Sequence, residues 1–257
     1  EEIREFHEKV INDALGVEKK SNRITKTGDQ NFWGVGIPSM AGATAWENQG
    51  GGNKFNRPWY GHSAEDTLDK VDMELIKIPF KVIATSLLRL CNNPVLPFDF
   101  FTVMEVFKKG LQDLQAHNTS ALDLPSLINQ AETLQQKIDT LHSSIDKNLL
   151  AYQIDRNDNG IESNFKMINA CLMELSRIIM PILSTKAGKY GQDPWGVKFT
   201  PIPRLQPLTK LAAMNSESDE YNALLTSLTI ERNRVSDALD LANRTLSNIV
   251  NSLLSQW

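Results

Sequence analysis

The feature that most constrains the fold is a regular run of apolar residues in the second half of the chain. Its members are spaced three and four apart, and they are Leu124, Leu127, Ala131, Leu134, Ile138, Leu141 and Ile145. This spacing places them on one face of a helix, and its length is typical of a helix that packs along a partner helix. The sequence therefore predicts a helical bundle.

Further helices are predicted on both sides of this run. One should begin at Asp72, where Pro79 either kinks it or lies in its true first turn, and the next should begin at Asp99. Another covers residues 165–179 and should end before Pro181, and a last one covers residues 219–254. Residues 188–207 are rich in proline, and a loop of that length is usually functional or tied down by its neighbours. Together these segments predict a four-helix bundle.

The segment from residue 21 to residue 61 has a different character. It contains eight of the fourteen glycines, so the backbone there must turn tightly or approach another group closely. Within it, residues 32–38 are predicted to form a short buried strand that Pro38 ends. An amphipathic helix at residues 3–15 precedes it. We therefore expect an α/β segment followed by a mostly α-helical bundle domain.

Composition narrows the classes of function. The chain has 257 residues, 41% of them hydrophobic, and a net charge of −4, as in soluble globular proteins of one or two domains. Its charges are spread rather than clustered, which disfavours nucleic acid as a partner. The apolar runs fall short of the roughly 20 residues that span a bilayer, so no membrane span is expected. The chain starts without Met or a signal peptide, and we expect it to be a piece of a longer protein.

Cysteine and histidine give few candidates for chemistry. Cys91 and Cys171 lie on apolar helical faces and are predicted to be buried free thiols. His7, His117 and His142 are predicted to be solvated. His62 is different, because it lies in a loop between the glycines and a helix. On residue chemistry alone it is either an exposed loop histidine or a zinc ligand.

Two motifs around His62 resemble the co-catalytic zinc aminopeptidase family. In that family a G-I-P strand precedes a W-x-x-H-[ST]-x-x-D-T loop, whose histidine is the last ligand of a two-zinc centre. Here Gly36-Ile37-Pro38 precedes the loop Trp59-Tyr60-Gly61-His62-Ser63-Ala64-Glu65-Asp66-Thr67. The resemblance makes residues 1–95 the C-terminal portion of a zinc peptidase domain.

The remaining chain resembles the helical dimerisation domain of glutamate carboxypeptidase and the transferrin receptor. Residues 94–99, with the sequence PVLPFD, resemble the junction into that domain. Residues 188–196, with the sequence GKYGQDPWG, resemble a loop between its later helices. Residues 96–257 would then be a transferrin receptor-like dimerisation domain, and we expect a homodimer through the bundle.

The resemblance implies hydrolysis of peptide substrates by a hydroxide bound between two zinc ions. His62 would be one metal ligand, while the other ligands and the general-base glutamate of the family lie further upstream than this chain extends. A catalytic zinc needs three protein ligands, so the chain alone is expected to be inactive and to need the remaining part of the catalytic domain. Family members of this kind suggest a secreted, periplasmic or extracellular location.

Three residues beside His62 are candidates for contact with substrate. Many relatives have a tyrosine immediately before the histidine, where its hydroxyl can stabilise the oxyanion. Here Gly61 takes that place and Tyr60 comes one residue earlier, so Tyr60 is our candidate for the oxyanion role and Trp59 and Gly61 are candidates for substrate binding. The alternative is a non-catalytic, transferrin receptor-like dimerisation or binding module.

Overall fold

The computed structural model describes residues 1–18, 20–21, 32, 34–40, 59–117, 121–194, 196 and 198–254. Within the glycine-rich segment of residues 21–61, residues 22–31, 33 and 41–58 lie outside the described residues. The chain divides into two compact units. One consists of Glu1–Arg4, Asn22–Ser39 and Pro94–Trp257, and the other of Glu5–Ser21 and Met40–Asn93.

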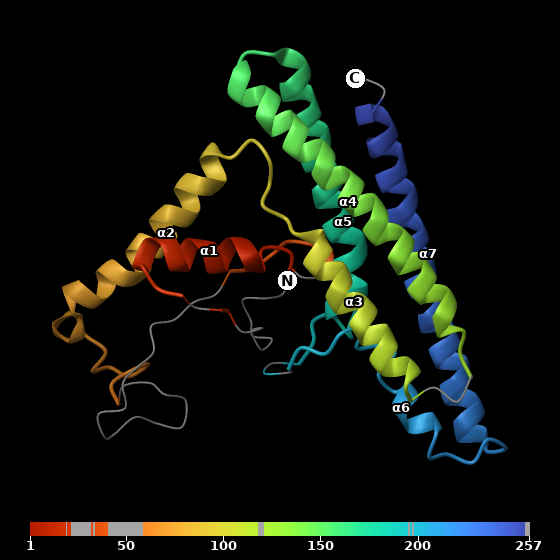
Figure 1. The fold of residues 1–257 in the computed structure, drawn as a ribbon. Helices are drawn as coiled ribbons and strands as arrows, with labels where there is room; N and C mark the ends of the chain where they lie inside the picture. The colour runs from red at the N-terminus through yellow and green to blue at the C-terminus, as the bar shows by residue number, and fades with distance from the viewer. Residues whose placement is uncertain are drawn as a thin grey trace. The chain divides into compact units, whose positions relative to one another are not determined.

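Helices are the regular structure of the described residues. They are α1 (Arg4–Leu15), the 3-10 turn η2 (Leu68–Lys70), α2 (Met73–Asn92), α3 (Phe100–Gln115), α4 (Leu124–Ile154), α5 (Asn159–Ser184), α6 (Leu208–Leu211) and α7 (Asp219–Leu254) (Figure 1). The part of the chain that the structure describes has no strand, so the predicted α/β character of the first segment is wrong.

The larger unit is built on a four-helix bundle, as the apolar spacing predicted. Helix α4 packs against α3, α5 and α7, and α5 also packs against α7. Figure 1 shows that α4 and α7 run in the same direction, with α3 and α5 antiparallel to them. Three hydrogen bonds join this parallel pair. Ser236 Oγ donates to Gln130 Oε1 (3.0 Å), Asn243 Nδ2 donates to Gln130 O (3.1 Å), and Lys137 Nζ donates to Asn243 O (3.1 Å).

The predicted apolar face of α4 lies in the core of this bundle. Six of its seven predicted members, from Leu124 to Leu141, are at most 1% exposed. Ile145, the seventh, is only partly buried, whereas Asn148 beyond it is fully buried. Asn164 Nδ2 of α5 donates to Asn148 Oδ1 (2.9 Å), so the end of the α4–α5 hairpin is joined by buried amides as well as by apolar packing.

Aspartates begin three of the bundle helices and α2. The side chains of Asp99, Asp123 and Asp158 accept hydrogen bonds from the first free backbone N–H groups of α3, α4 and α5. Asp72 does the same for α2. The predicted caps at Asp72 and Asp99 are thus confirmed.

Helix α5 is longer than the sequence predicted. It continues through Pro181 to Ser184, whereas an end before that proline was expected. A proline removes one backbone donor. The turn beyond it is nevertheless held from outside, because Leu183 is buried and its carbonyl accepts from Ile202 N (3.0 Å).

The predicted strand at residues 32–38 is wrong in the described residues, which exclude Trp33. Residues 32, 34 and 35 have 3-10 turn geometry, and Gly36 has a φ of +72°, in the left-handed region. Ile37 N donates back to Phe32 O (3.2 Å), which closes the turn locally. An isolated strand would leave its backbone groups unpaired, and a turn satisfies some of them within the segment.

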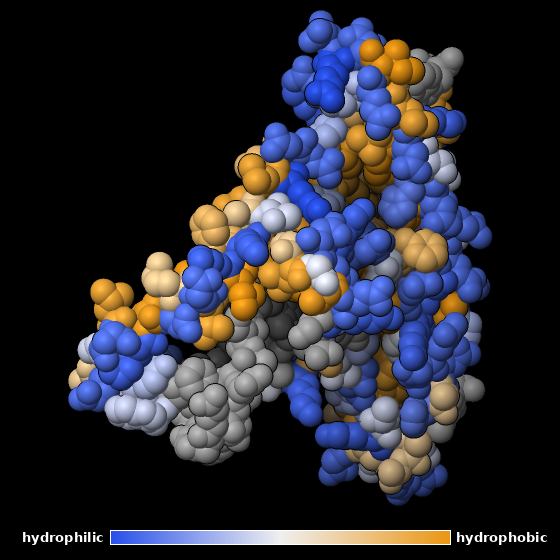
Figure 2. Space-filling model, turned by 60° about the vertical axis from the view of Figure 1, so that its left-hand side comes forward, coloured by the Kyte–Doolittle hydropathy of each residue, from blue (hydrophilic) through white to orange (hydrophobic). Residues whose placement is uncertain are grey.

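Helix α2 of the smaller unit exposes an apolar face. Ser86 is the helix's only buried residue, and Arg89 Nη2 pairs with Asp13 Oδ2 of α1 (2.7 Å). The exposed side chains follow a three-and-four spacing and form what we call the α2 stripe: Met73, Ile76, Phe80, Ile83, Leu87 and Leu90, which are 36% to 67% exposed. Figure 2 shows hydrophobic side chains on the surface of the segment that carries α1 and α2. A stripe of this kind is typical of a surface that a further polypeptide covers.

Helix α5 is long and apolar enough to span a membrane, by length and composition alone. More than half of that apolar stretch, 56%, is buried inside the protein, as in the core helix of a bundle. The apolar length of α5 is therefore explained by its packing against α4 and α7.

The two cysteines should react differently with alkylating reagents. Cys171 is buried as predicted, and desolvation, with a further contribution from Glu174, raises its pKa to about 12. Cys91 is exposed, contrary to the prediction. Because the thiolate is the reactive form, iodoacetamide at mildly alkaline pH should modify Cys91 of the native chain, and Cys171 only after denaturation. Mass spectrometry of the wild-type and Cys91→Ser chains measures this, and equal modification rates at the two thiols would contradict it.

Candidate functional site

The loop that carries His62 is held by its own short-range hydrogen bonds. Ser63 N and Ser63 Oγ both donate to Tyr60 O (3.0 and 2.6 Å), and Asp66 N donates to Ser63 O (3.1 Å). His62 N donates to Asp66 Oδ2 (3.3 Å). The serine and aspartate of the family-like motif therefore act here on the backbone of the loop.

His62 has a left-handed backbone. Its φ is +64°, a conformation that non-glycine residues adopt uncommonly and that marks a tight turn. His62 is exposed, and the other residues of the turn, from 59 to 67, are exposed or partly exposed. Such a conformation needs support from its surroundings, which Asp66 supplies through the backbone N–H of His62.

The neighbouring candidates lie on the same turn. Trp59 is 67% exposed, and its ring meets that of Tyr60 edge to face, with centroids 5.6 Å apart. Tyr60 and Gly61 are half-buried. The structure thus brings Trp59, Tyr60, Gly61 and His62 together on one turn. Their roles in substrate binding and oxyanion stabilisation stay predictions.

The described residues do not complete a zinc site around His62. Among them, no three histidine, cysteine or acidic side chains are grouped closely enough to hold a metal ion. Asp69, the nearest acidic residue beyond the motif, bonds to Lys70 and Thr67, which lower the pKa of its carboxyl. Since a catalytic zinc takes three protein ligands, the described residues around His62 do not form such a site, and its role as a ligand stays a prediction.

The other histidines lie away from this loop in sequence. His117 is exposed just after α3, where its Nδ1 lies 2.8 Å from Asp113 O. His7 and His142 are half-buried, and desolvation lowers the pKa of His7 against an opposing effect of Glu8. The prediction of a solvated histidine therefore holds for His117, while the other two are partly covered.

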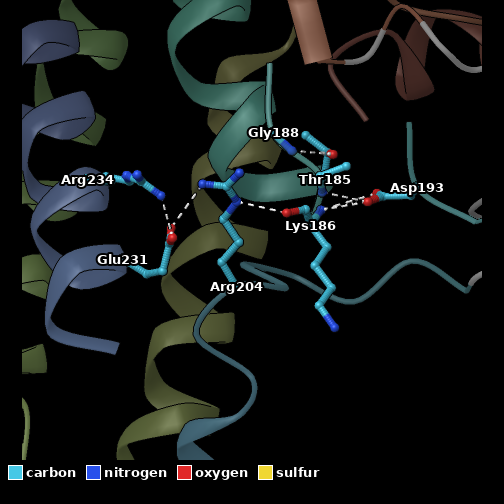
Figure 3. Close-up of polar contacts among 8 residues, drawn as sticks. Thr185, Lys186, Gly188, Asp193, Arg204, Glu231 and Arg234 are labelled. Carbon is cyan, nitrogen blue, oxygen red and sulfur yellow. Dashed lines mark hydrogen bonds and ion pairs between the residues drawn. The ribbon is translucent and has the colours of Figure 1, made fainter. Parts of the chain in front are cut away.

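The loop between α5 and α6 contains a second polar site, whose residues were not predicted from the sequence. The loop between α5 and α6 is tied at its start by Asp193, whose Oδ1 accepts from Lys186 N (3.1 Å) and Ala187 N (2.7 Å) (Figure 3). Gly188 N donates to Thr185 Oγ1 (3.1 Å). The start of this loop is thereby folded on itself.

An arginine then joins this loop to α7. Arg204 Nε donates to Lys186 O (3.0 Å), and Arg204 Nη1 pairs with Glu231 Oε2 (3.0 Å) (Figure 3). Glu231 also pairs with Arg234 (2.5 Å). We call Asp193, Arg204 and Glu231 the loop latch. The length of this loop indicated that it is either functional or tied down by its neighbours. Its partners in the structure include Glu231, which is distant in sequence.

Comparison of the chain with family models, with curated proteins and with solved structures finds no match.

The loop latch should contribute measurably to stability. Arg204→Ala removes a charged hydrogen bond to Lys186 O and the pairing with Glu231, and should lower the free energy of unfolding by about 1 to 3 kcal/mol. The matched control is Arg244→Ala, because Arg244 pairs with Asp240 on the exposed side of α7. Loss of that exposed pair should cost less than about 0.5 kcal/mol. Urea denaturation followed by circular dichroism measures both, and equal losses would contradict the role of the latch.

Proposed function

We propose that this chain is part of a zinc-dependent exopeptidase, to which it supplies one metal ligand and a helical dimerisation module. The observation that carries the proposal is the loop of residues 59–67, in which the histidine of a specific zinc-peptidase motif stands exposed on a tight turn. A neutral imidazole on such a turn suits a terminal zinc ligand, with peptides as the substrate.

The α2 stripe supports the part of the proposal that concerns a missing partner. It begins at Met73, only eleven residues after His62, and its six apolar side chains are exposed. A polypeptide that covers the start of the stripe would also lie near the His62 loop, because few residues separate the two in the chain. We infer that the remaining part of the catalytic domain packs there and carries the other ligands. The apolar stripe would then form part of the hydrophobic shell that controls solvent access and dielectric around a metal.

The second candidate is a non-catalytic dimerisation or binding module. Two observations favour it. The described residues contain no group of three side chains that could hold a metal ion, and the bundle has an extensive apolar core. The two proposals differ in the need for His62, since only a peptidase uses its imidazole. A secreted or envelope-associated location is part of the first proposal and rests on the resemblance alone.

The peptidase proposal makes a prediction in two stages. The chain alone should neither bind zinc stoichiometrically in a calorimetric titration nor hydrolyse aminoacyl or peptidyl substrates, because it supplies one ligand of three. The gene upstream of Glu1 should encode the H-x-D, Glu-Glu and Asp positions. In the protein expressed from that longer gene, His62→Ala should reduce bound zinc and lower activity by at least about 100-fold, whereas His117→Ala should change neither.

Each result separates the candidates. Tight zinc binding with turnover by the chain alone would contradict the claim that it is only a part of the site. Absence of the upstream ligand positions would overturn the peptidase proposal and favour the module. Unchanged zinc content in the His62→Ala protein would show that His62 is not a ligand.

The dimer proposal is tested separately from the α2 stripe. Sedimentation equilibrium of the chain should give twice its mass of 28.9 kDa. Because the exposed stripe can also associate, the triple variant Phe80→Glu, Ile83→Glu, Leu87→Glu serves as the control. A dimer through the bundle should persist in this variant. A monomeric variant would place the association on α2 and contradict dimerisation by the bundle.

A further inference from the structure

The surface of α5 carries a closely fitted contact with a glycine segment. Gly34 and Gly36 are buried, and Ser176 of α5 is 0% exposed. Ser176 Oγ lies 2.9 Å from Gly36 O and 3.0 Å from Glu2 Oε1, within reach of its single hydroxyl proton. All of these residues belong to the larger unit.

The fit depends on the absence of side chains at both glycines. A Cβ at Gly36 would lie 2.5 Å from Ser176 C, and one at Gly34 would lie 2.5 Å from Lys189 O. Both neighbours are backbone atoms, which cannot turn away as a flexible side chain does. Gly36 also has the left-handed φ of +72°, which glycine adopts without strain. The contact is therefore selective for the pattern Gly-x-Gly.

We propose that α5 around Ser176, with the loop at Gly188 and Lys189, is a docking site for a Gly-x-Gly peptide, occupied in this chain by residues 34–39. The site donates a hydrogen bond from the Ser176 hydroxyl, and the ligand accepts it with a backbone carbonyl. The surfaces that enclose the ligand's two glycines are backbone atoms. The site is a property of the bundle surface and is independent of the proposed zinc chemistry. It gives the bundle a second role beside dimerisation, which is to hold the segment that precedes the His62 loop in the chain.

The site predicts binding of the same sequence in trans when its own segment is displaced. Gly36→Val in the full chain should expel residues 34–39, because the new side chain meets the backbone of α5. A fluorescein-labelled peptide with the sequence of residues 32–40 should then bind this variant at least about 10-fold more tightly than the wild-type chain, whose own segment competes at a high effective concentration. Fluorescence anisotropy measures both affinities.

Two controls separate docking from strain and from non-specific binding. Gly16→Val introduces valine at another left-handed glycine (φ +66°) with no atom within 4 Å of its Cβ, so it should bind the peptide as weakly as the wild type. The peptide carrying valine at the position of Gly36 should bind neither chain. Equal affinity of the Gly36→Val and wild-type chains for the peptide would overturn the proposal.

A second variant keeps the proposal testable if Gly36→Val does not fold. Ser176→Ala removes the hydroxyl that lies within hydrogen-bond distance of Gly36 O and of Glu2 Oε1. It should increase amide hydrogen exchange of residues 34–39 about fivefold, as expected for loss of one hydrogen bond. Ser143→Ala, on the exposed side of α4, is the matched control. Unchanged exchange at residues 34–39 in Ser176→Ala would show that the segment is not docked by this hydroxyl.

Discussion

The parallel packing of α4 against α7 is the interaction on which the larger unit depends. Both helices bury apolar faces in the common core, including Leu134 and Ile138 on α4 and Leu239 and Leu246 on α7, each at most 1% exposed. Two parallel neighbours cannot be joined by a tight turn, so the chain must return along the bundle between them. Helix α5 makes this return, and it closes the core because its own apolar face packs against both helices.

The long loop after α5 follows from the same constraint. The chain must pass from the end of α5 to the start of α7, and it does so through Ile202, Leu205 and α6, whose apolar side chains are buried in the core. A loop that enters the core has to satisfy its backbone groups without a ladder of helix or sheet bonds. The side chains of Asp193 and Arg204 do this for Lys186 and Ala187, and Arg204 also joins the loop to α7 through Glu231.

The sequence predicts those parts of the fold that depend on local spacing. The bundle, the caps at Asp72 and Asp99 and the position of His62 in a loop before a helix follow from residues close together in the chain. The prediction of a strand at residues 32–38 was wrong because apolar residues between glycines fit a strand and a turn equally well. The turn is the conformation that packs closely against the backbone of α5. The prediction that a helix ends before Pro181 was also wrong, because the turn beyond the proline is held by Ile202 of the following loop. The loop latch and the docking of Gly36 on Ser176 join distant segments, which a single sequence does not reveal.

The α2 stripe and the His62 loop impose related requirements on the smaller unit. Most of the stability of a protein helix comes from tertiary packing of its apolar face, and α2 has only one buried residue. A polypeptide that covered the stripe would therefore stabilise α2. Ligand geometry and dielectric both set metal affinity, so completion of a metal site at His62 would be linked thermodynamically to burial of the stripe.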